Sequence, residues 1–285
     1  MTEKSDDVTV LADVDVSFLR SEHVGDEFKI FVARASAEAS VPPPHVLVVT
    51  DAQLQYGTAL EMARMYQGTE LIPPLLVVGV GYRAKYFGET LELRKRDLTP
   101  PPAVDGQGGG APAFLAFLDE ELKPFLGERY GVASAEYTLY GHSFGGLFGA
   151  WTLFTKPEAF SAYGIGSPSV WWGGRAVLET ESQYAMNHDD LPARVFIGIG
   201  GMENPAGDLH AIKWLPEEKR PAAYQEAEAD TVDMVADTAV LASRLERRHY
   251  PGLKLEHRTF PGEYHTTTIP SNLSGALRSL FDTPR

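Results

Sequence analysis

A serine flanked by glycines is the strongest chemical signal in this sequence. Residues 141–145 read Gly-His-Ser-Phe-Gly, with β-favouring residues before them and a packed helical pattern after them. A Gly-x-Ser-x-Gly segment between a strand and a helix forms a sharp turn, which exposes the serine Oγ and aims the next backbone N–H at the same point. We therefore expect Ser143 to be a nucleophile and the N–H of Phe144 to stabilise an oxyanion. The alternative is that the glycines only let a helix pack closely on a sheet.

A base and an acid follow the serine in the chain order that such sites use. His265 lies in a turn just after a predicted C-terminal strand, so it is the candidate general base. Glu203 follows the predicted strand Val195–Ile199 in a Gly-Gly loop, where it could orient the histidine. Asp208 is the alternative acid, because it lies a few residues further along the same loop. Asp237 is a weaker candidate, since it lies in a helical pattern where a solvated face explains it.

Together these groups would perform acyl transfer. Ser143 Oγ would attack an ester carbonyl while His265 takes its proton and then gives a proton to the leaving alcohol. A second oxyanion donor is expected at the backbone N–H of Ala52 or Gln53, in the loop after an early strand. Asp51, at the end of that strand, has two interpretations: it caps the following helix, or it shapes the oxyanion hole.

Other side chains are candidates for contact with the substrate. Trp171 and Trp172 could stack on a flat group, although core packing of at least one of them is the favoured interpretation. Arg96 could hold an anionic substrate, as could Arg83 and Arg94, but ion pairs within the protein are the commoner use of such arginines. The histidines that we expect to be structural are His142, His249 and His257.

Composition excludes several other kinds of protein. The 285 residues are 44% hydrophobic, which is enough for one core, and a single domain is the default. The chain has no cysteine, so a thiol nucleophile, a disulfide and a thiolate metal site are all impossible. The histidines are scattered without the spacing of a zinc helix, so we expect neither a metal nor another cofactor.

Charge and hydropathy bear on partners and location. The formal net charge of −14 argues against a general affinity for nucleic acid or anionic membranes. The first residues are polar and acidic, and no apolar run approaches the length needed to cross a bilayer. We therefore expect a cytoplasmic protein whose partner is a small-molecule ester, while its oligomeric state stays open.

The predicted elements alternate in the way that builds a parallel α/β sheet. Two alternating segments, Val8–Val16 and Phe28–Ala33, are typical of edge strands. Continuous apolar runs at 45–50 and 75–80, with a predicted helix at 57–67 between them, indicate a βαβ unit and helices on both faces of the sheet. Further strands are expected at 138–140, 162–165, 195–199 and 255–260, and further helices at 112–130, after residue 145 and at 227–250.

Two connections are longer than simple turns. Residues 82–107 are rich in charge and lead into a glycine cluster at 106–110, which we expect to form a flexible lip. Residues 204–225 separate the candidate acid from the helix at 227–250 and are predicted to form a lid over the site.

Five ordered segments resemble the esterase D-type esterases, a group of α/β-hydrolases that includes the trilactone siderophore esterases. The segments are Asp51-Ala52-Gln53, Arg96-Asp97-Leu98-Thr99-Pro100, residues 141–146, Ser167-Pro168-Ser169-Val170-Trp171-Trp172 and Gly262-Glu263-Tyr264-His265. The resemblance runs from about Val46 to the C-terminus. It implies a carboxylic ester hydrolase with Ser143 as nucleophile, His265 as base and Glu203 as acid, and it leaves open a Ser-His pair without the acid. The family often has glycine at the position of Ala52.

Two other functions are compatible with the sequence. An acyltransferase or a thioesterase would use the same residues with a different acceptor or leaving group. A non-catalytic binding protein would keep the fold, but the intact Ser143 and His265 argue against it.

Overall fold

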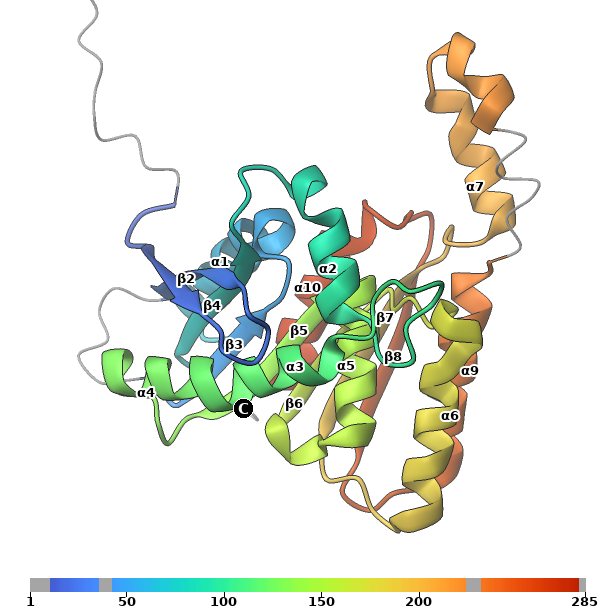
Figure 1. Ribbon diagram of the computed structural model, residues 1–285. Coiled ribbons are helices and arrows are strands. Elements are labelled where there is room, and N and C mark those ends of the chain that lie inside the picture. Colours follow the sequence, from blue (N-terminus) through green and yellow to red (C-terminus); the bar gives the residue numbers. More distant parts are fainter. Residues whose placement is uncertain (1–10, 36–42, 224–231, 282–285) are drawn as a thin grey trace, which may run out of the picture.

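An eight-stranded sheet forms the centre of the fold in the computed structural model, which describes residues 11–35, 43–223 and 232–281 (Figure 1). The strand order is β1-β2-β4-β3-β5-β6-β7-β8. The β1–β2 and β2–β4 pairs are antiparallel, and every other pair is parallel. The strands are β1 (Asp15–Arg20), β2 (Glu27–Arg34), β3 (His45–Val49), β4 (Leu75–Tyr82), β5 (Glu136–His142), β6 (Ala162–Gly166), β7 (Arg194–Gly200) and β8 (Lys254–Phe260). This mostly parallel sheet confirms the predicted α/β-hydrolase class.

Helices cover both faces of the sheet, which explains the continuous apolar runs of its inner strands. Helices α1 (Ala52–Gly68) and α10 (Thr268–Phe281) share one core with one face. The other face packs on α3 (Ala111–Ala116), η2 (Phe117–Leu122), α4 (Lys123–Tyr130), α5 (Phe144–Thr155), α6 (Trp172–Asn187) and α9 (Met234–Arg248). Shorter elements are η1 (Phe87–Thr90), α2 (Leu91–Leu98), η3 (Pro157–Ala159), α7 (Pro205–Ala211), η4 (Ile212–Trp214) and η5 (Glu217–Lys219). Figure 1 shows the resulting three layers.

The helix predicted at 112–130 is present but is not uniformly α-helical. Its middle, η2, is a π-helical stretch between α3 and α4. Pro124, at the start of α4, has no N–H to continue the α-helical hydrogen-bond ladder. A wider turn before the proline accommodates this missing donor.

Two predicted boundaries near the N-terminus are wrong. The first edge strand is β1, not Val8–Val16, of which residues 8–10 lie outside the described part of the chain. Its position is set by antiparallel pairing with β2, which local alternation cannot reveal. Helix α1 begins at Ala52 rather than at Gly57, because the chain leaves β3 through Asp51 with a φ of 51° and enters the helix at once.

Helices α2, α6 and α10 were not predicted, nor was the short α7 within the segment predicted as a lid. The connection at 82–107 contains α2, whose sequence of alternating charges carries no apolar stripe because two of its charged side chains, Arg94 and Asp97, are themselves buried. Helix α6 follows Trp171, and α10 follows the loop that carries His265. Helix α10 has an apolar face with helical spacing that predicts it well in retrospect.

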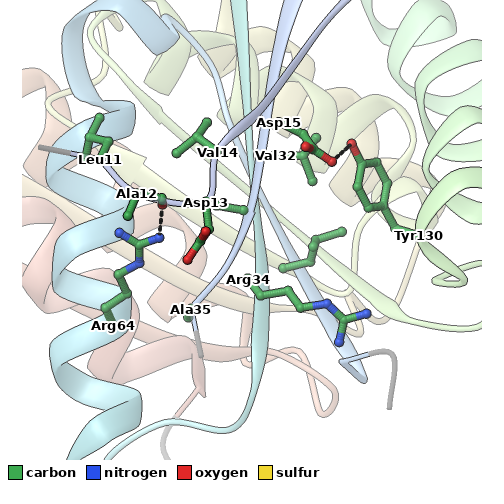
Figure 2. Close-up of a pocket in the computed structure, with 12 residues that line it drawn as sticks. Leu11, Ala12, Asp13, Val14, Asp15, Val32, Arg34, Ala35, Arg64 and Tyr130 are labelled. Carbon is green, nitrogen blue, oxygen red and sulfur yellow. Dashed lines mark hydrogen bonds between the residues drawn. The ribbon is translucent and has the colours of Figure 1, made fainter. Parts of the chain in front are cut away.

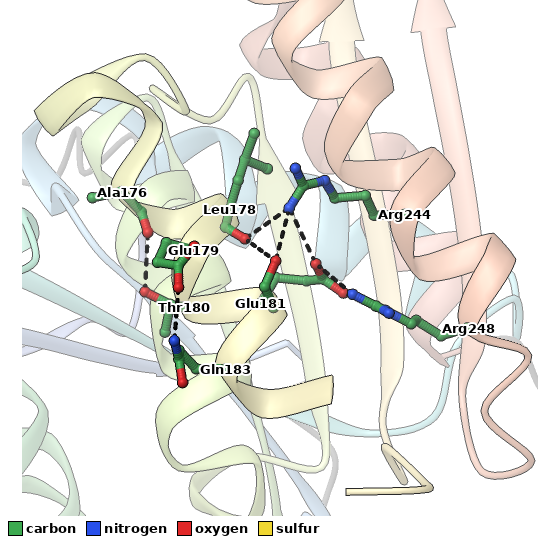
Figure 3. Close-up of polar contacts among 9 residues, drawn as sticks. Ala176, Leu178, Glu179, Thr180, Glu181, Gln183, Arg244 and Arg248 are labelled. Carbon is green, nitrogen blue, oxygen red and sulfur yellow. Dashed lines mark hydrogen bonds and ion pairs between the residues drawn. The ribbon is translucent and has the colours of Figure 1, made fainter. Parts of the chain in front are cut away.

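Helices α6 and α9 are joined by a buried carboxylate (Figure 3). Glu181 of α6 is 1% exposed and accepts from Arg248 Nε at 2.8 Å and from Arg244 Nη1 at 3.4 Å. Arg244 also donates to the carbonyl oxygen of Leu178. Because both arginines lie on α9, this cluster fixes α9 against α6 and so supports the sheet edge formed by β7 and β8.

The six parallel strands place their carboxyl ends at one edge of the sheet, where parallel α/β folds hold their sites. The residues that leave β3, β5, β6, β7 and β8 therefore meet there. No helix within the described ranges combines the length and apolar character that a bilayer span requires.

Candidate active site

The segment from β5 to α5 adopts the sharp turn predicted for a nucleophile. Ser143 has φ 63° and ψ −120°, a conformation that L-residues rarely adopt, and Phe144 begins α5 directly after it. A Cβ on Gly141 would overlap the backbone of Gly145, and one on Gly145 would overlap Thr50 Oγ1. Both glycines are therefore required by close contacts, and the half-buried Ser143 is left facing the carboxyl edge of the sheet.

His265 and Glu203 come together from loops that follow adjacent strands. His265 Nδ1 lies 2.6 Å from Glu203 Oε2. The glutamate side chain is 1% exposed, whereas that of the histidine is 39% exposed. Asp208 instead lies exposed in the first turn of α7. The structure thus places Glu203 where an orienting acid is needed, with its charge shielded and the histidine open to a ligand.

The remaining oxygen of Glu203 is held by two further groups. Oε1 accepts from the backbone N–H of Gly200 at 2.7 Å and from Ser167 Oγ at 2.6 Å. The sequence alone predicted no role for Ser167, the first residue of the segment Ser167–Trp172. The signal that could have found it is a polar residue directly after a buried strand, at the sheet edge where the other candidates lie.

Asp237 does not lie on a solvated face, contrary to the sequence prediction. It is 4% exposed on α9 and accepts from Arg175 Nε at 2.6 Å. Its helical position was read correctly, but the partner that allows its burial comes from α6 and cannot be inferred locally.

His142 packs beside the candidate base. Its ring is buried, and its centroid lies 4.7 Å from that of His265. Burial, with smaller effects from His265 and Arg94, holds the pKa of His142 well below 6.5. His142 is therefore a neutral side chain. By packing, it links the turn at residues 141–145, called the elbow below, to the loop that carries His265, called the histidine loop.

Ser143 has a second hydroxyl for a neighbour. Ser143 Oγ and Ser169 Oγ lie 3.4 Å apart, and the N–H of Ser169 donates to the carbonyl oxygen of Ser143. The oxygen–oxygen distance is long for a hydrogen bond of this type, which leaves the Ser143 hydroxyl weakly held before a ligand binds.

Two helix N-termini meet next to the serine. Phe144 opens α5 and Ala52 opens α1, so the first N–H of each helix has no acceptor within its own helix. The contact between Gly145 and Thr50 places the two N-termini side by side. Gln53, the alternative second donor, uses its side chain to bind the backbone of Tyr82.

A buried ion pair fixes the loop that carries Ala52. Asp51 accepts from Arg94 Nε at 3.0 Å and from Arg94 Nη2 at 2.9 Å, and its side chain is fully buried. It makes no side-chain cap on α1, so the capping interpretation is wrong. Burial alone would lower the pKa of Arg94, but the adjacent carboxylate outweighs this effect and raises it. The Arg94 guanidinium also lies 5.2 Å from the Phe144 ring centroid, so the ion pair braces both helix N-termini.

The two candidate tryptophans differ in exposure. Trp172 is buried in the core, and Trp171 is half-buried. The ring of Phe144 lies 5.2 Å from that of Trp172 and 6.0 Å from that of Trp171. Trp171 is therefore the tryptophan that borders the elbow with surface to spare for a ligand.

Arg96 is committed to carboxylates of the protein. Its Nε and Nη2 donate to Asp97, and its Nη1 donates to Asp26 at 3.0 Å. This geometry does not support Arg96 as a substrate ligand. The guanidinium N–H groups that would bind an anion already donate to Asp97 and Asp26.

The segment predicted as a lid forms a helical arm, residues 205–219, that projects from the body beside α9 (Figure 1). Residues 224–225 of the predicted lid lie outside the described ranges. The arm meets the histidine loop through Tyr264, whose ring centroid is 5.2 Å from that of Trp214, and whose hydroxyl contacts His210. Trp214 is 63% exposed.

A cavity of about 880 Å³ lies elsewhere in the molecule (Figure 2). Its lining combines residues before and within β1 and β2, such as Asp13 and Arg34, with Arg64 of α1 and Tyr130 of α4. Arg34 pairs with Leu76 near the amino end of β4, so this cavity is at the end of the sheet opposite the serine. Its lining stops at Leu11 and Ala35, beside residues that the structure does not describe, and it takes no part in the candidate site.

Among the described residues, no three potential protein ligands gather in a way that could hold a metal ion.

Comparison with known proteins agrees with this geometry. Residues 21–249 match the family described as "Putative esterase". The chain is 30% identical over 256 residues to the siderophore triacetylfusarinine C esterase of Aspergillus fumigatus, covering 84% of this chain and 82% of that protein. It is 29% identical over 285 residues to the ferri-bacillibactin esterase BesA of Bacillus subtilis, covering 93% of this chain and 88% of the relative.

Solved structures show the same architecture over nearly the whole chain. The BES protein from Bacillus cereus superposes with a TM-score of 0.80 at 27% identity, covering 99% of both chains. The siderophore hydrolase EstB from Aspergillus nidulans superposes with a TM-score of 0.81 at 25% identity, covering 99% of this chain and 100% of that one. The chain therefore belongs to the "Putative esterase" family and is a serine hydrolase of carboxylic esters with the α/β-hydrolase fold.

Proposed function

We propose that the chain hydrolyses esters through an acyl-enzyme on Ser143, with His265 as general base and Glu203 as the acid that orients it. The observation that carries this proposal is the buried Glu203 carboxylate bonded to His265 Nδ1 at the sheet edge where the elbow presents Ser143. With Nδ1 occupied, the free Nε2 of His265 is the nitrogen left to take the serine proton.

The reaction then follows from these groups. Ser143 Oγ forms a bond to the ester carbonyl carbon as its proton passes to His265, and the imidazolium gives that proton to the leaving alcohol. Water attacks the acyl-enzyme with the same histidine as base and releases the acid. The N–H groups of Phe144 and Ala52 would hold the oxyanion, since both are helix N-terminal donors with no intrahelical acceptor. The N–H of Gln53 is the alternative to Ala52.

The relatives suggest the class of ester. Three curated relatives carry names of siderophore esterases, for triacetylfusarinine C, ferri-bacillibactin and enterobactin. We propose that this chain cleaves ester bonds of a siderophore of comparable size. Such a substrate would contact the half-buried Trp171 beside Phe144 and the exposed Trp214 of the arm at 205–219, and this arm would act as its lid.

The Ser143→Ala variant tests the assignment. It should lose turnover of an activated aryl ester by about 10⁶-fold, the scale known for removal of a triad serine, while it keeps its thermal unfolding midpoint. Hydrolysis of triacetylfusarinine C, bacillibactin and enterobactin, each with and without iron, would be followed by mass spectrometry. Residual activity of a few per cent in a contamination-free preparation would remove Ser143 from the mechanism. Cleavage of the aryl ester without cleavage of any of the three siderophores would overturn only the substrate class.

We also propose that the chain is a single domain, that its partner is a small molecule and that it lies in the cytoplasm. One sheet runs from β1 to β8, which supports a single domain for the whole chain. The formal net charge of −14 supports a small-molecule partner rather than nucleic acid or an anionic membrane. A chain without cysteine needs no oxidising compartment for disulfides, which is compatible with the cytoplasm. Fractionation of cells that produce the native protein would test that location.

A further inference from the structure

A chain of hydrogen bonds leads from the buried core to the candidate acid. Asn272 Nδ2 lies 3.1 Å from Ser167 Oγ, which lies 2.6 Å from Glu203 Oε1. Asn272 and Ser167 are both fully buried. The acyl-transfer scheme above assigns no step to either of them.

The chemistry of the three groups gives this chain a direction. An ionised carboxylate only accepts hydrogen bonds, so the hydrogen of the Ser167 hydroxyl must point to Glu203. A hydroxyl has one hydrogen, so Ser167 must accept in its contact with Asn272, whose amide nitrogen only donates. The asparagine therefore sets the rotamer of the serine hydroxyl, and the serine hydroxyl stabilises the charge of Glu203.

The backbone conformation at Ser167 is strained, and the backbone at Gly198 leaves space for these hydrogen bonds. Ser167 has a φ of 40°, in the left-handed region where glycine would be strain-free. Because glycine would avoid this strain, a serine here indicates that the hydroxyl is needed for its hydrogen bond to Glu203. On the other side, a Cβ on Gly198 would overlap Asn272 Oδ1, so the glycine of β7 leaves the space through which the asparagine reaches Ser167.

Asn272 is also an exception within its helix. It lies on the face of α10 that otherwise packs apolar side chains such as Leu273 and Ala276 against the sheet. Burying an amide among such side chains is unfavourable unless it makes hydrogen bonds. The bond from Nδ2 to Ser167 offsets part of this cost, whereas Oδ1 has no hydrogen-bond partner among the described residues.

We propose that Ser167 and Asn272 are positioning residues that hold the Glu203 carboxylate in place and aimed at His265. This inference rests on the proposed function, since it assumes that Glu203 acts on His265 during ester hydrolysis. With Gly200, His265 and Ser167 as donors, the two carboxylate oxygens of Glu203 share three hydrogen bonds, and the loss of Ser167 leaves Oε1 with one.

The central experiment is a double-mutant cycle between Ser167→Ala and Glu203→Gln, measured on an aryl ester. Ser167→Ala alone should lower kcat by about 10-fold with KM within about twofold, as expected for the loss of a hydrogen bond to a charged group. In the Glu203→Gln background the same substitution should have no further effect, because Ser167 acts only through that carboxylate. Ser167→Cys, which keeps a weak donor, should recover part of the loss.

Two further measurements separate positioning from general stability. Asn272→Leu, close in shape but without donors, should lower kcat in the same direction as Ser167→Ala, and it should weaken the far-downfield proton resonance of the His265 Nδ1–Glu203 bond. Thr138→Val is the matched control, since Thr138 on β5 is fully buried and its hydroxyl has no hydrogen-bond partner within the part of the chain that the structure describes. It should leave kcat and the resonance unchanged.

The outcomes distinguish this inference from the proposed function. Wild-type kcat in Ser167→Ala, an equal loss in both backgrounds of the cycle, or full activity of Glu203→Gln would each overturn the positioning role while Ser143-dependent hydrolysis stood. Hydrolysis that survives Ser143→Ala would instead overturn the proposed function. If Asn272→Leu fails to fold, the cycle with Ser167→Ala still decides the question.

Discussion

At the residue scale, the site depends on which carboxylate reaches His265. Glu203 and Asp208 are only five positions apart, but Glu203 sits at the end of the turn after β7 with its side chain buried, and Asp208 is exposed on α7. Several hydrogen bonds hold this buried carboxylate in place, which is what an orienting acid would require.

Replacement of each carboxylate by its amide tests this assignment. Glu203→Gln should lower kcat by about 10⁴-fold with little change in KM, because the histidine loses its orientation and the stabilisation of its cation. Asp208→Asn is the matched control and should retain wild-type activity on the same aryl ester. An inactive Asp208→Asn enzyme beside an active Glu203→Gln enzyme would move the role to Asp208. Full activity in both would favour a Ser143-His265 pair that works alone.

At the scale of elements, the N-termini of α1 and α5 lie beside the carboxyl ends of the strands, and the Asp51–Arg94 ion pair stabilises this arrangement. It ties the start of α1 to α2, while the Arg94 guanidinium also lies near the Phe144 ring at the start of α5. The position of both proposed oxyanion donors, the N–H groups of Ala52 and Phe144, would therefore depend on one charged pair that is almost inaccessible to solvent.

Arg94→Met should leave the Asp51 carboxylate buried without its partner. We expect a loss of about 3–5 kcal/mol in the free energy of unfolding, measured by urea denaturation. Arg83→Met removes an exposed arginine from its pair with Glu27 and should cost at most about 1 kcal/mol. Similar losses in the free energy of unfolding for the two variants would contradict a stabilising role of the Asp51–Arg94 pair. The double variant Asp51→Asn/Arg94→Met should recover part of the loss, because no unpaired charge remains.

The arm at 205–219 carries a separate prediction about substrate size. Trp214→Ala should raise KM for a siderophore ester by up to about 10-fold, the value of one aromatic contact, and should leave KM for a small phenyl ester unchanged. Met186→Ala removes another exposed apolar side chain, at the far end of α6, and serves as the control. Equal effects on the large and the small ester would show that the arm does not contact substrate.

At the scale of the whole molecule, buried histidines couple stability to pH. Burial lowers the pKa of His142, His45 and His257 below the usual 6.5. As the pH falls below 6.5, the unfolded chain binds protons at these positions that the folded chain does not bind. The free energy of unfolding therefore decreases towards acid pH, and this contribution is complete only above about pH 6.5.

The contribution of His142 to this pH dependence of the unfolding free energy can be measured with a single substitution. A single such histidine accounts for a slope of at most about 1.4 kcal/mol per pH unit. His142→Asn should show a correspondingly shallower fall in unfolding free energy between pH 6.5 and 5 than the wild type, in denaturation series at several pH values. His23→Gln, which removes a histidine on the surface, should keep the wild-type slope. Parallel slopes for wild type and His142→Asn would show that His142 titrates normally.

Local chemistry in the sequence already determined the nucleophile turn and most of the sheet. The turn at Ser143 needs glycine at 141 and 145 because a Cβ would overlap backbone or side chain, and this steric demand is readable in five residues. Strands such as β4 and β6 are continuous apolar runs because helices cover both faces, and the alternation of such runs with helical segments predicts a parallel sheet.

Tertiary structure decided the partners of each polar group. The bonds Glu203–His265, Asp51–Arg94 and Ser167–Asn272 join residues 62, 43 and 105 positions apart. Such pairs form only when strand register and helix packing bring their loops to one edge of the sheet, and no local pattern encodes that register. For the same reason the solvated face predicted for Asp237 is wrong, because the guanidinium that pairs with it belongs to Arg175, 62 positions away on α6.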